Sequence, residues 1–241
     1  MTVRGTQSAV PLFDYYADTY REVINKSIRW SGEDYEYFID LRVRMMSKKL
    51  QEYSSSSVFL PRKVLDFGCG IGATAPFLRR AMPGAYLFGV DISVASIRAA
   101  QERAAGGMEF MVYDGKTLPY SDKAFDVIYM NGVMHHIPVG ERHDMFCELW
   151  RVTASGGVMF IFENNPWNPL MVRAMRKNPF DDGTEAIKLS NLSLLASNAD
   201  FRAVKSWYYC FCPRFLKFLR PLEPKIGQFP IGAQYCLWVT K

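Results

Sequence analysis

The segment that most constrains this chain spans residues 64–72 and reads VLDFGCGIG. A short apolar run that ends in an acid and three alternate glycines predicts a strand that turns through a glycine loop into a helix. Glycines remove the Cβ atoms that would hold a ligand away from the backbone, and the free N–H groups of the helix attract an anionic group. The segment therefore predicts a nucleotide-type binding loop in an α/β sheet.

The spacing of the glycines separates two kinds of ligand. A dinucleotide fingerprint is Gly-x-Gly-x-x-Gly, whereas Gly68, Gly70 and Gly72 follow a Gly-x-Gly-x-Gly pattern. Asp66 stands directly before the loop, where a carboxylate disfavours a pyrophosphate. Nineteen residues after Gly72, Asp91 closes the next apolar run, where a carboxylate can accept hydrogen bonds from both hydroxyls of a ribose. A glycine turn without any ligand is the alternative, because either motif alone has little specificity.

This combination resembles the first motif of class I S-adenosylmethionine-dependent methyltransferases. The resemblance covers Arg62 to Glu163 well and the flanks only loosely. It implies an α/β fold with a Rossmann-like sheet of seven strands, mostly parallel with the last strand antiparallel, and an N-terminal helical lid. It also implies S-adenosylmethionine as the cofactor and no metal. The cofactor-binding residues that we expect on this basis are Asp66, Phe67, Gly68, Gly70, Gly72, Asp91, Ile92, Asp114, Gly115, Asn131, Tyr20 and Tyr16.

Hydrophobic patterning predicts one α/β domain with additions. We expect a helical extension over residues 1–57 and a cofactor-binding core over residues 58–241, with substrate-side insertions at 164–190 and 212–232. Strands and helices alternate through the core, which predicts a parallel sheet with right-handed crossovers. The later strands are expected at 86–91, 108–113, 125–130, 158–162, 203–211 and 233–240, and the helices at 13–24, 33–53, 73–82, 93–105, 138–152 and 192–199.

Two cofactor contacts have alternatives that the sequence leaves open. Tyr16 and Tyr20 lie one helical turn apart, which predicts an aromatic stripe on the first helix. The resemblance implies that this helix folds over the cofactor as a lid, whereas the stripe can equally pack on the helices of the sheet. Asp114 would accept a hydrogen bond from the adenine amine, with a turn-forming Asp before Gly115 as the alternative.

Two neighbouring histidines follow the fourth predicted strand at the carboxyl edge of the sheet, where ligands of such sheets bind. A hydroxyl acceptor must lose its proton, and a histidine has a pKa suited to that task. We predict His136 as the general base, His135 as its neighbour, and Glu163 as the carboxylate that orients or charge-stabilises one imidazole. The alternatives are two hydrogen-bonded structural histidines, and a Glu163 that caps amides of the following Asn-Pro loop.

The leading interpretation is an enzyme that moves a methyl group to a small molecule, at a hydroxyl oxygen, in secondary-metabolite or glycan biosynthesis. An N- or C-methyltransferase would have nearly the same core. A non-catalytic scaffold that binds S-adenosylmethionine is a second alternative. A nicotinamide oxidoreductase is a third, which Asp66 and the glycine spacing disfavour.

Composition disfavours several other classes. The chain has 241 residues, of which 49% are hydrophobic, and scattered basic residues give a net charge of +5, so we expect a folded protein that does not bind nucleic acid. Five cysteines that match no zinc spacing fit reduced thiols in the cytoplasm. No run approaches a membrane span, and no apolar signal core is apparent.

The segment 214–222 has a basic amphipathic pattern. Its apolar residues repeat at helical spacing, opposite three basic residues. Such a turn can make a weak contact with an anionic bilayer, without stable membrane insertion. A lid over the substrate pocket and a contact in a homodimer are the alternatives.

Overall fold

The structure is a computed structural model that describes residues 14, 19–54, 61–103 and 107–241. Its centre is a seven-stranded sheet in the order β3-β2-β1-β4-β5-β7-β6. The strands are β1 Lys63–Phe67, β2 Tyr86–Asp91, β3 Met108–Val112, β4 Phe125–Asn131, β5 Thr153–Asn164, β6 Arg202–Tyr209 and β7 Gln234–Thr240. Strand β7 is antiparallel to both β5 and β6, while the other pairs are parallel. The predicted fold class, a mostly parallel Rossmann-like sheet with an antiparallel last strand, is confirmed.

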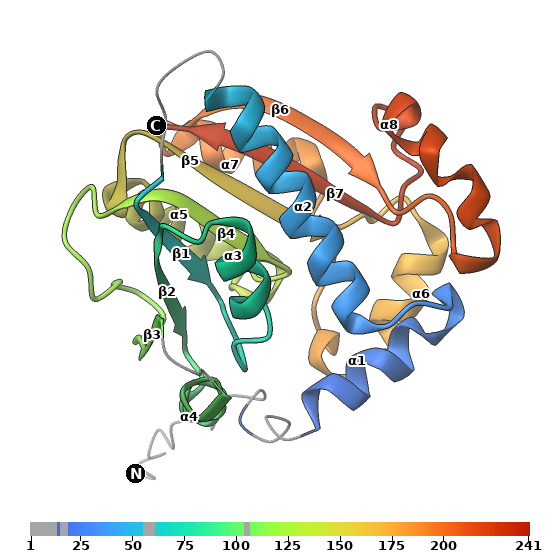
Figure 1. The fold of residues 1–241 in the computed structure, drawn as a ribbon, viewed down its shortest axis with the longest axis horizontal. Helices are drawn as coiled ribbons and strands as arrows, with labels where there is room; N and C mark the ends of the chain where they lie inside the picture. Colours follow the sequence, from blue (N-terminus) through green and yellow to red (C-terminus); the bar gives the residue numbers. More distant parts are fainter. Residues whose placement is uncertain (1–13, 15–18, 55–60, 104–106) are drawn as a thin grey trace, which may run out of the picture.

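Helices lie on both sides of this sheet (Figure 1). The α-helices are α1 Tyr20–Ile28, α2 Tyr35–Ser54, α3 Ala75–Ala81, α4 Val94–Arg103, α5 Arg142–Val152, α6 Pro169–Lys177, α7 Leu189–Asn198 and α8 Glu223–Ile226. The 3₁₀ segments are η2 Arg29–Ser31, η3 Met134–His136, η4 Val139–Glu141, η5 Pro179–Asp181 and η6 Arg214–Leu222. Local chemistry sets two helix starts. The Ser93 hydroxyl accepts from the Ser96 amide at 3.0 Å, and the Asn168 side chain accepts from the Met171 amide at 2.9 Å.

Two apolar layers cover the faces of the sheet. Helices α2 and α3 cover one face, and α5 and α7 cover the other (Figure 1). Neighbouring residues of β1 point to opposite faces, so Val64 packs in the layer that contains α2 and α3, and Leu65 packs in the layer that contains α5 and α7. Burial on both faces is typical of a central parallel strand, and it explains why the β1 sequence is an unbroken apolar run up to Asp66.

Some element boundaries differ from the sequence-based expectations. Strand β5 begins at Thr153, directly after α5, rather than at Val158. Thr153 pairs with Phe125 of β4, and a register shift after Phe125 accommodates the residues up to Val158, including the glycine pair. Pro138 precedes a 3₁₀ turn, and α5 begins only at Arg142. Helix α1 begins at Tyr20, and the residues predicted to precede it lie largely outside the described ranges.

The division at residue 57 into an extension and a core stays a prediction, because residues 55–60 lie outside the described ranges. Helix α2, within that extension, buries Ile39, Val43 and Met46 against the sheet. It therefore belongs to the same apolar core as the strands. Among the described residues, none of the helices is both long and apolar enough to span a bilayer.

Candidate functional site

The carboxyl ends of β1, β2 and β4 open into a cavity of about 360 Å³. This volume lies in the range of small-molecule binding sites. Helices α1, α2 and α6 and the turn η5 form its other walls. Among the residues predicted from sequence, the cavity brings together Tyr20, Gly68, Gly70, Asp91, Ile92, Gly115, Asn131, His135 and His136.

The glycine loop faces the cavity with its backbone. Gly70 has a φ of +51°, and a Cβ added there would meet nothing within 4 Å. A Cβ added at Gly72, in contrast, would lie 2.9 Å from Ala100 and 3.0 Å from Phe110. The missing side chain therefore allows helix α4 and strand β3 to pack closely. Gly70 therefore leaves room for a ligand, whereas Gly72 serves packing.

Asp91 fixes this loop at the end of β2. Its carboxylate accepts from the Gly70 amide and from the Ser93 amide, each at 2.9 Å. Burial raises the pKa of Asp91, while these backbone hydrogen bonds oppose the shift. Asp91 and Gly70 both line the cavity, so the carboxylate is held where a ribose could reach it.

Asp66 is a buried acid with an unsatisfied oxygen. Its side chain is 2% exposed, and Oδ2 has no hydrogen-bond partner among the described residues. It lines a small hollow that adjoins the main cavity and shares Tyr20, Gly68 and Gly70 with it. Burial and the nearby Asp91 raise the pKa of Asp66 to about 8. A cationic group at this position would satisfy Oδ2, and the ammonium of S-adenosylmethionine fits that requirement.

Arg42 provides a buried cation that sequence reasoning missed. Its side chain lines the cavity, and it donates from Nε to the Tyr129 hydroxyl at 3.3 Å and from Nη1 to Gln234 Oε1 at 3.2 Å. Both partners are neutral, and no carboxylate lies within salt-bridge distance of Arg42 in the described part of the chain. A guanidinium with several donors in such a wall suits a carboxylate ligand. No sequence signal separates it from other basic residues of the α2 pattern.

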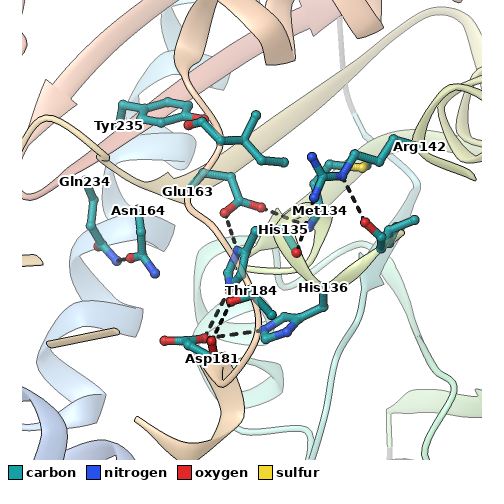
Figure 2. Close-up of polar contacts among 12 residues, drawn as sticks. Met134, His135, His136, Arg142, Glu163, Asn164, Asp181, Thr184, Gln234 and Tyr235 are labelled. Atoms are coloured by element: carbon teal, nitrogen blue, oxygen red, sulfur yellow. Dashed lines mark hydrogen bonds and ion pairs between the residues drawn. The ribbon is translucent and has the colours of Figure 1, made fainter. Parts of the chain in front are cut away.

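The two histidines form a hydrogen-bonded cluster with two acids (Figure 2). His135 Nδ1 lies 2.6 Å from Glu163 Oε2, and its Nε2 lies 3.2 Å from Asp181 Oδ1. His136 Nε2 lies 3.6 Å from the same Asp181 oxygen. Glu163 also accepts from the Met134 amide at 2.9 Å, which ties β5 to the turn after β4. The expected proximity of both histidines and Glu163 is therefore present.

The acids give the two imidazoles different charges. Burial disfavours the charged form of His135, but Glu163 and Asp181 outweigh it and raise its pKa to about 10. Burial and the neighbouring His135 charge lower the pKa of His136 to about 4. At neutral pH His135 is an imidazolium and His136 is neutral. Only His136 is thus in the protonation state that a general base requires.

Asp181 belongs to this cluster, although the sequence analysis did not single it out. Asn178 donates to Asp181 Oδ2 at 2.9 Å and fixes the carboxylate. One ligand atom from each of His135, His136 and Asp181 lies within 4.8 Å of the others, a set that can hold a divalent cation. Both ring nitrogens of His135 already have carboxylate partners, so a proton shared within this hydrogen-bonded network satisfies the ring.

Besides Gly72, three predicted cofactor contacts lie away from the cavity or outside the described ranges. Asp114 is exposed, and its Oδ1 accepts from the Lys116 amide at 2.8 Å and the Thr117 amide at 2.7 Å, which is the geometry of a turn-forming Asp. Phe67 is buried in the sheet behind the loop. Tyr16 falls outside the residues that the structure describes. Their roles as cofactor contacts stay predictions.

The Asn-Pro loop has its own caps. Asn165 Oδ1 accepts from the Trp167 amide at 3.1 Å, so Glu163 is not needed there and is used by Met134 instead. Trp167 is 61% exposed and does not line the cavity. Tyr20 lines the cavity, and its ring also lies edge-on to the Tyr35 ring of helix α2, with ring centroids 5.8 Å apart. The role of the first helix as a lid stays a prediction.

Apolar side chains from α1, α2, α6 and the segment after β6 line much of the cavity, beside polar residues such as Glu33 and Arg220. The apolar lining residues include Ile24, Ile28, Trp30, Phe38, Leu170, Met171, Ala174, Met175 and Phe211. An acceptor that reaches the histidines would therefore lie against apolar side chains.

Comparisons with known proteins agree with this geometry. Residues 64–157 match the family described as a methyltransferase domain. The chain is 31% identical over 110 residues to phthiotriol/phenolphthiotriol dimycocerosates methyltransferase 1 of Mycobacterium ulcerans, a match that covers 45% of this chain and 40% of that protein. It is 35% identical over 116 residues to methyltransferase GfsG of Streptomyces halstedii, covering 46% and 41%. The matched segment thus spans about two fifths of the length of these curated relatives.

A solved structure shows the same fold over nearly the whole chain. It is an S-adenosylmethionine-dependent methyltransferase from Thermotoga maritima, described as a possible histamine N-methyltransferase. The TM-score is 0.65 at 18% identity, and the match covers 95% of this chain and 98% of that one. The sheet order, the glycine loop with its paired acids and these matches together identify the methyltransferase domain of this chain over residues 64–157. The domain is of the class I S-adenosylmethionine-dependent type, whose cofactor is S-adenosylmethionine.

Proposed function

We propose that this protein transfers the methyl group of S-adenosylmethionine to a hydroxyl oxygen of a small, largely apolar molecule, with His136 as the general base. One observation carries the proposal. The same cavity is lined by the glycine loop and Asp91 and also by His136 and many apolar side chains. A cofactor and an acceptor could therefore meet inside it.

Three ionisable side chains would hold the cofactor. Asp91 would accept from the ribose hydroxyls, Asp66 would pair with the ammonium of the methionine moiety, and Arg42 would pair with its carboxylate. Asp66 and Arg42 are both buried and lack an ionic partner of opposite charge within salt-bridge distance among the described residues. A zwitterion would supply both missing charges. When bound, S-adenosylmethionine supplies an electrophilic methyl group on a sulfonium.

His136 would take the proton that the acceptor oxygen releases as the oxygen gains the methyl group and the methyl–sulfur bond breaks. Its Nε2 lies 3.6 Å from Asp181 Oδ1. Asp181 would then stabilise the imidazolium that forms. The oxygen becomes strongly acidic during attack, so a weakly basic imidazole suffices. The apolar walls would orient the acceptor and exclude water.

The names of the relatives support a small-molecule acceptor. One relative is named a phthiotriol/phenolphthiotriol dimycocerosates methyltransferase. The solved structure is described as a possible histamine N-methyltransferase. Transfer to nitrogen or carbon would use the same cavity, and the identity of the product distinguishes these reactions. We expect the reaction in the cytoplasm, where the five free cysteines of this chain stay reduced.

The test is incubation of the protein with labelled S-adenosylmethionine and metabolite extracts, followed by mass spectrometry of the molecules that gain a methyl group. Methylation at oxygen that requires His136 supports the proposal. Methylation at nitrogen or carbon contradicts the assignment of a hydroxyl oxygen as the acceptor atom. Calorimetric titration with S-adenosylhomocysteine and with NAD tests the cofactor. Asp91→Ala should abolish binding of S-adenosylhomocysteine, whereas Asp114→Ala serves as an exposed control. Heat evolved by NAD alone would overturn the proposal.

A further inference from the structure

The insertion at residues 213–232 exposes large apolar side chains. Phe215 is 75% exposed, Phe218 70% and Leu222 49%, and from the same insertion Phe229 is 58% and Ile231 63% exposed. Isolated apolar residues are ordinary on a protein surface, but a group of them marks an interaction site. The insertion is thus a candidate docking surface.

The exposed charges of this insertion are all positive. Arg214, Lys217 and Lys225 are exposed. Its one acid, Glu223, is partly buried and accepts from the Cys212 amide at 2.9 Å. The neighbouring helix α6 adds three exposed basic side chains, Arg173, Arg176 and Lys177. The surface therefore complements an anionic partner.

Specific contacts fix the insertion against the domain. Arg220 donates to Glu33 at 2.8 Å and lies 4.8 Å from the centroid of the Tyr37 ring. Arg214 donates to the Gly32 carbonyl at 3.3 Å. Beyond η6, the Asn168 side chain donates to the carbonyl of Ile231 at 2.8 Å. The exposed side chains therefore project from a structured part of the protein.

The inner side of the insertion continues into the cavity. Pro213 and Arg220 line the cavity, while Phe215 and Phe218 of the same 3₁₀ segment point outward to solvent. Trp30 and Leu170 line the cavity and are themselves 40% and 53% exposed. Figure 1 shows α8, α6 and α1 along the same side of the domain. The insertion thus carries cavity-lining residues as well as exposed apolar side chains.

We propose that residues 213–232 dock on the surface of an anionic lipid bilayer, and that an apolar acceptor enters the cavity from that surface. Protruding aromatic side chains beside basic ones match the interfacial region of such a bilayer, which accepts apolar groups without a shaped pocket and attracts cations. Docking depends only on this surface. The passage of the acceptor rests on the proposed function, because it requires the cavity to hold that acceptor.

Co-sedimentation with vesicles tests the docking. We expect the wild-type protein to bind vesicles that contain phosphatidylglycerol, to bind pure phosphatidylcholine much more weakly, and to dissociate as salt is raised. The double variant Phe215→Ser/Phe218→Ser should lose binding by about tenfold or more. Lys217→Gln should weaken it by about fivefold, the effect of one basic side chain near an anionic surface.

Matched controls separate docking from folding and from cofactor binding. Val139→Ser and Leu194→Ser alter exposed apolar residues elsewhere, 76% and 60% exposed, and should leave vesicle binding unchanged. All variants should keep the wild-type melting temperature and affinity for S-adenosylhomocysteine. Absence of vesicle binding by a protein that still binds S-adenosylhomocysteine would overturn the docking proposal and leave methyl transfer intact. Equal binding to both lipids, or full binding by the double variant, would also overturn it.

Discussion

His135 and Glu163 form a buried ion pair in the wall of the cavity, with Nδ1 and Oε2 2.6 Å apart (Figure 2). Asp181 contacts the other nitrogen of the same ring at 3.2 Å. The pair keeps a positive charge beside His136, with the two imidazole centroids 4.1 Å apart. Electrostatics therefore divides two adjacent residues of the same type into a charged positioning residue and a neutral candidate base.

Glu163→Gln should destabilise the protein at neutral pH. Folding raises the His135 pKa to about 10, so the protonated ring stabilises the folded state. This contribution is fully present below the pKa of His135 in the unfolded chain and is lost as pH rises through about 10. Removing one partner of a buried pair costs about 3 kcal/mol or more. Urea unfolding at pH 7 should show this loss in the free energy of unfolding, and the difference between wild type and variant should be smaller at pH 10. Asp144→Asn, which removes only an exposed contact to His143, should change the free energy of unfolding little.

The general base can be identified by kinetics with a confirmed acceptor. His136→Gln should lower kcat by about 10²- to 10⁴-fold and leave S-adenosylhomocysteine affinity unchanged. His143→Gln, on the exposed side of α5, is the matched control. Because the pKa of His136 is lowered to about 4, the wild-type rate should stay level from neutral pH down to about 5. A tenfold fall over that range would indicate a histidine with an ordinary pKa and contradict the assignment.

The fold was predictable because each of its signals is local. An apolar run with glycines at fixed positions defines β1 and its loop, and alternating strands and helices define the parallel sheet. The start of β5 was missed because Gly156 and Gly157 suggest a turn, whereas backbone hydrogen bonds with Lys241 after β7 hold them in line with the strand. Tertiary pairing overrode the local signal at that point.

The candidate site was predictable where its residues follow strands. Asp91, His135 and Glu163 lie at or just after the carboxyl ends of β2, β4 and β5, so sheet topology brings them to one edge. Asp181 and Arg42 come from a turn and a helix that reach this edge through tertiary packing, and no spacing in the sequence marks them. The division of charge between the two histidines depends on Asp181, so it too required the structure.

Two glycines of the loop should respond differently to alanine. Gly70→Ala and Gly72→Ala both place a side chain at positive φ, which costs about 1 kcal/mol. Only Gly72→Ala also clashes with Ala100 and Phe110, so it should lose about 3 kcal/mol of unfolding free energy. Gly70→Ala should instead weaken S-adenosylhomocysteine binding by at least about tenfold, as measured by calorimetry. Equal affinity in wild type and Gly70→Ala would mean that the ligand does not approach this backbone.

Asp66 should release a proton when the cofactor binds. Its pKa of about 8 reflects burial and Asp91, opposed by Arg42, so most molecules carry the proton at pH 7. An ammonium beside the carboxylate favours the ionised form and expels that proton. Titration with S-adenosylhomocysteine at pH 7 in phosphate and in Tris, which differ in ionisation enthalpy, should therefore show release of nearly one proton.

The matched variant Asp66→Asn should release no proton and should bind S-adenosylhomocysteine more weakly. Without ligand it should melt a few degrees above wild type at pH 8. The reason is that Asp66 has a pKa near 4 in the unfolded chain and about 8 in the folded protein, so wild type loses stability as pH rises between these two values. Asparagine has no charge to bury. The melting difference should vanish near pH 4. If wild type and Asp66→Asn released the same number of protons, the ammonium would lie elsewhere in the cavity.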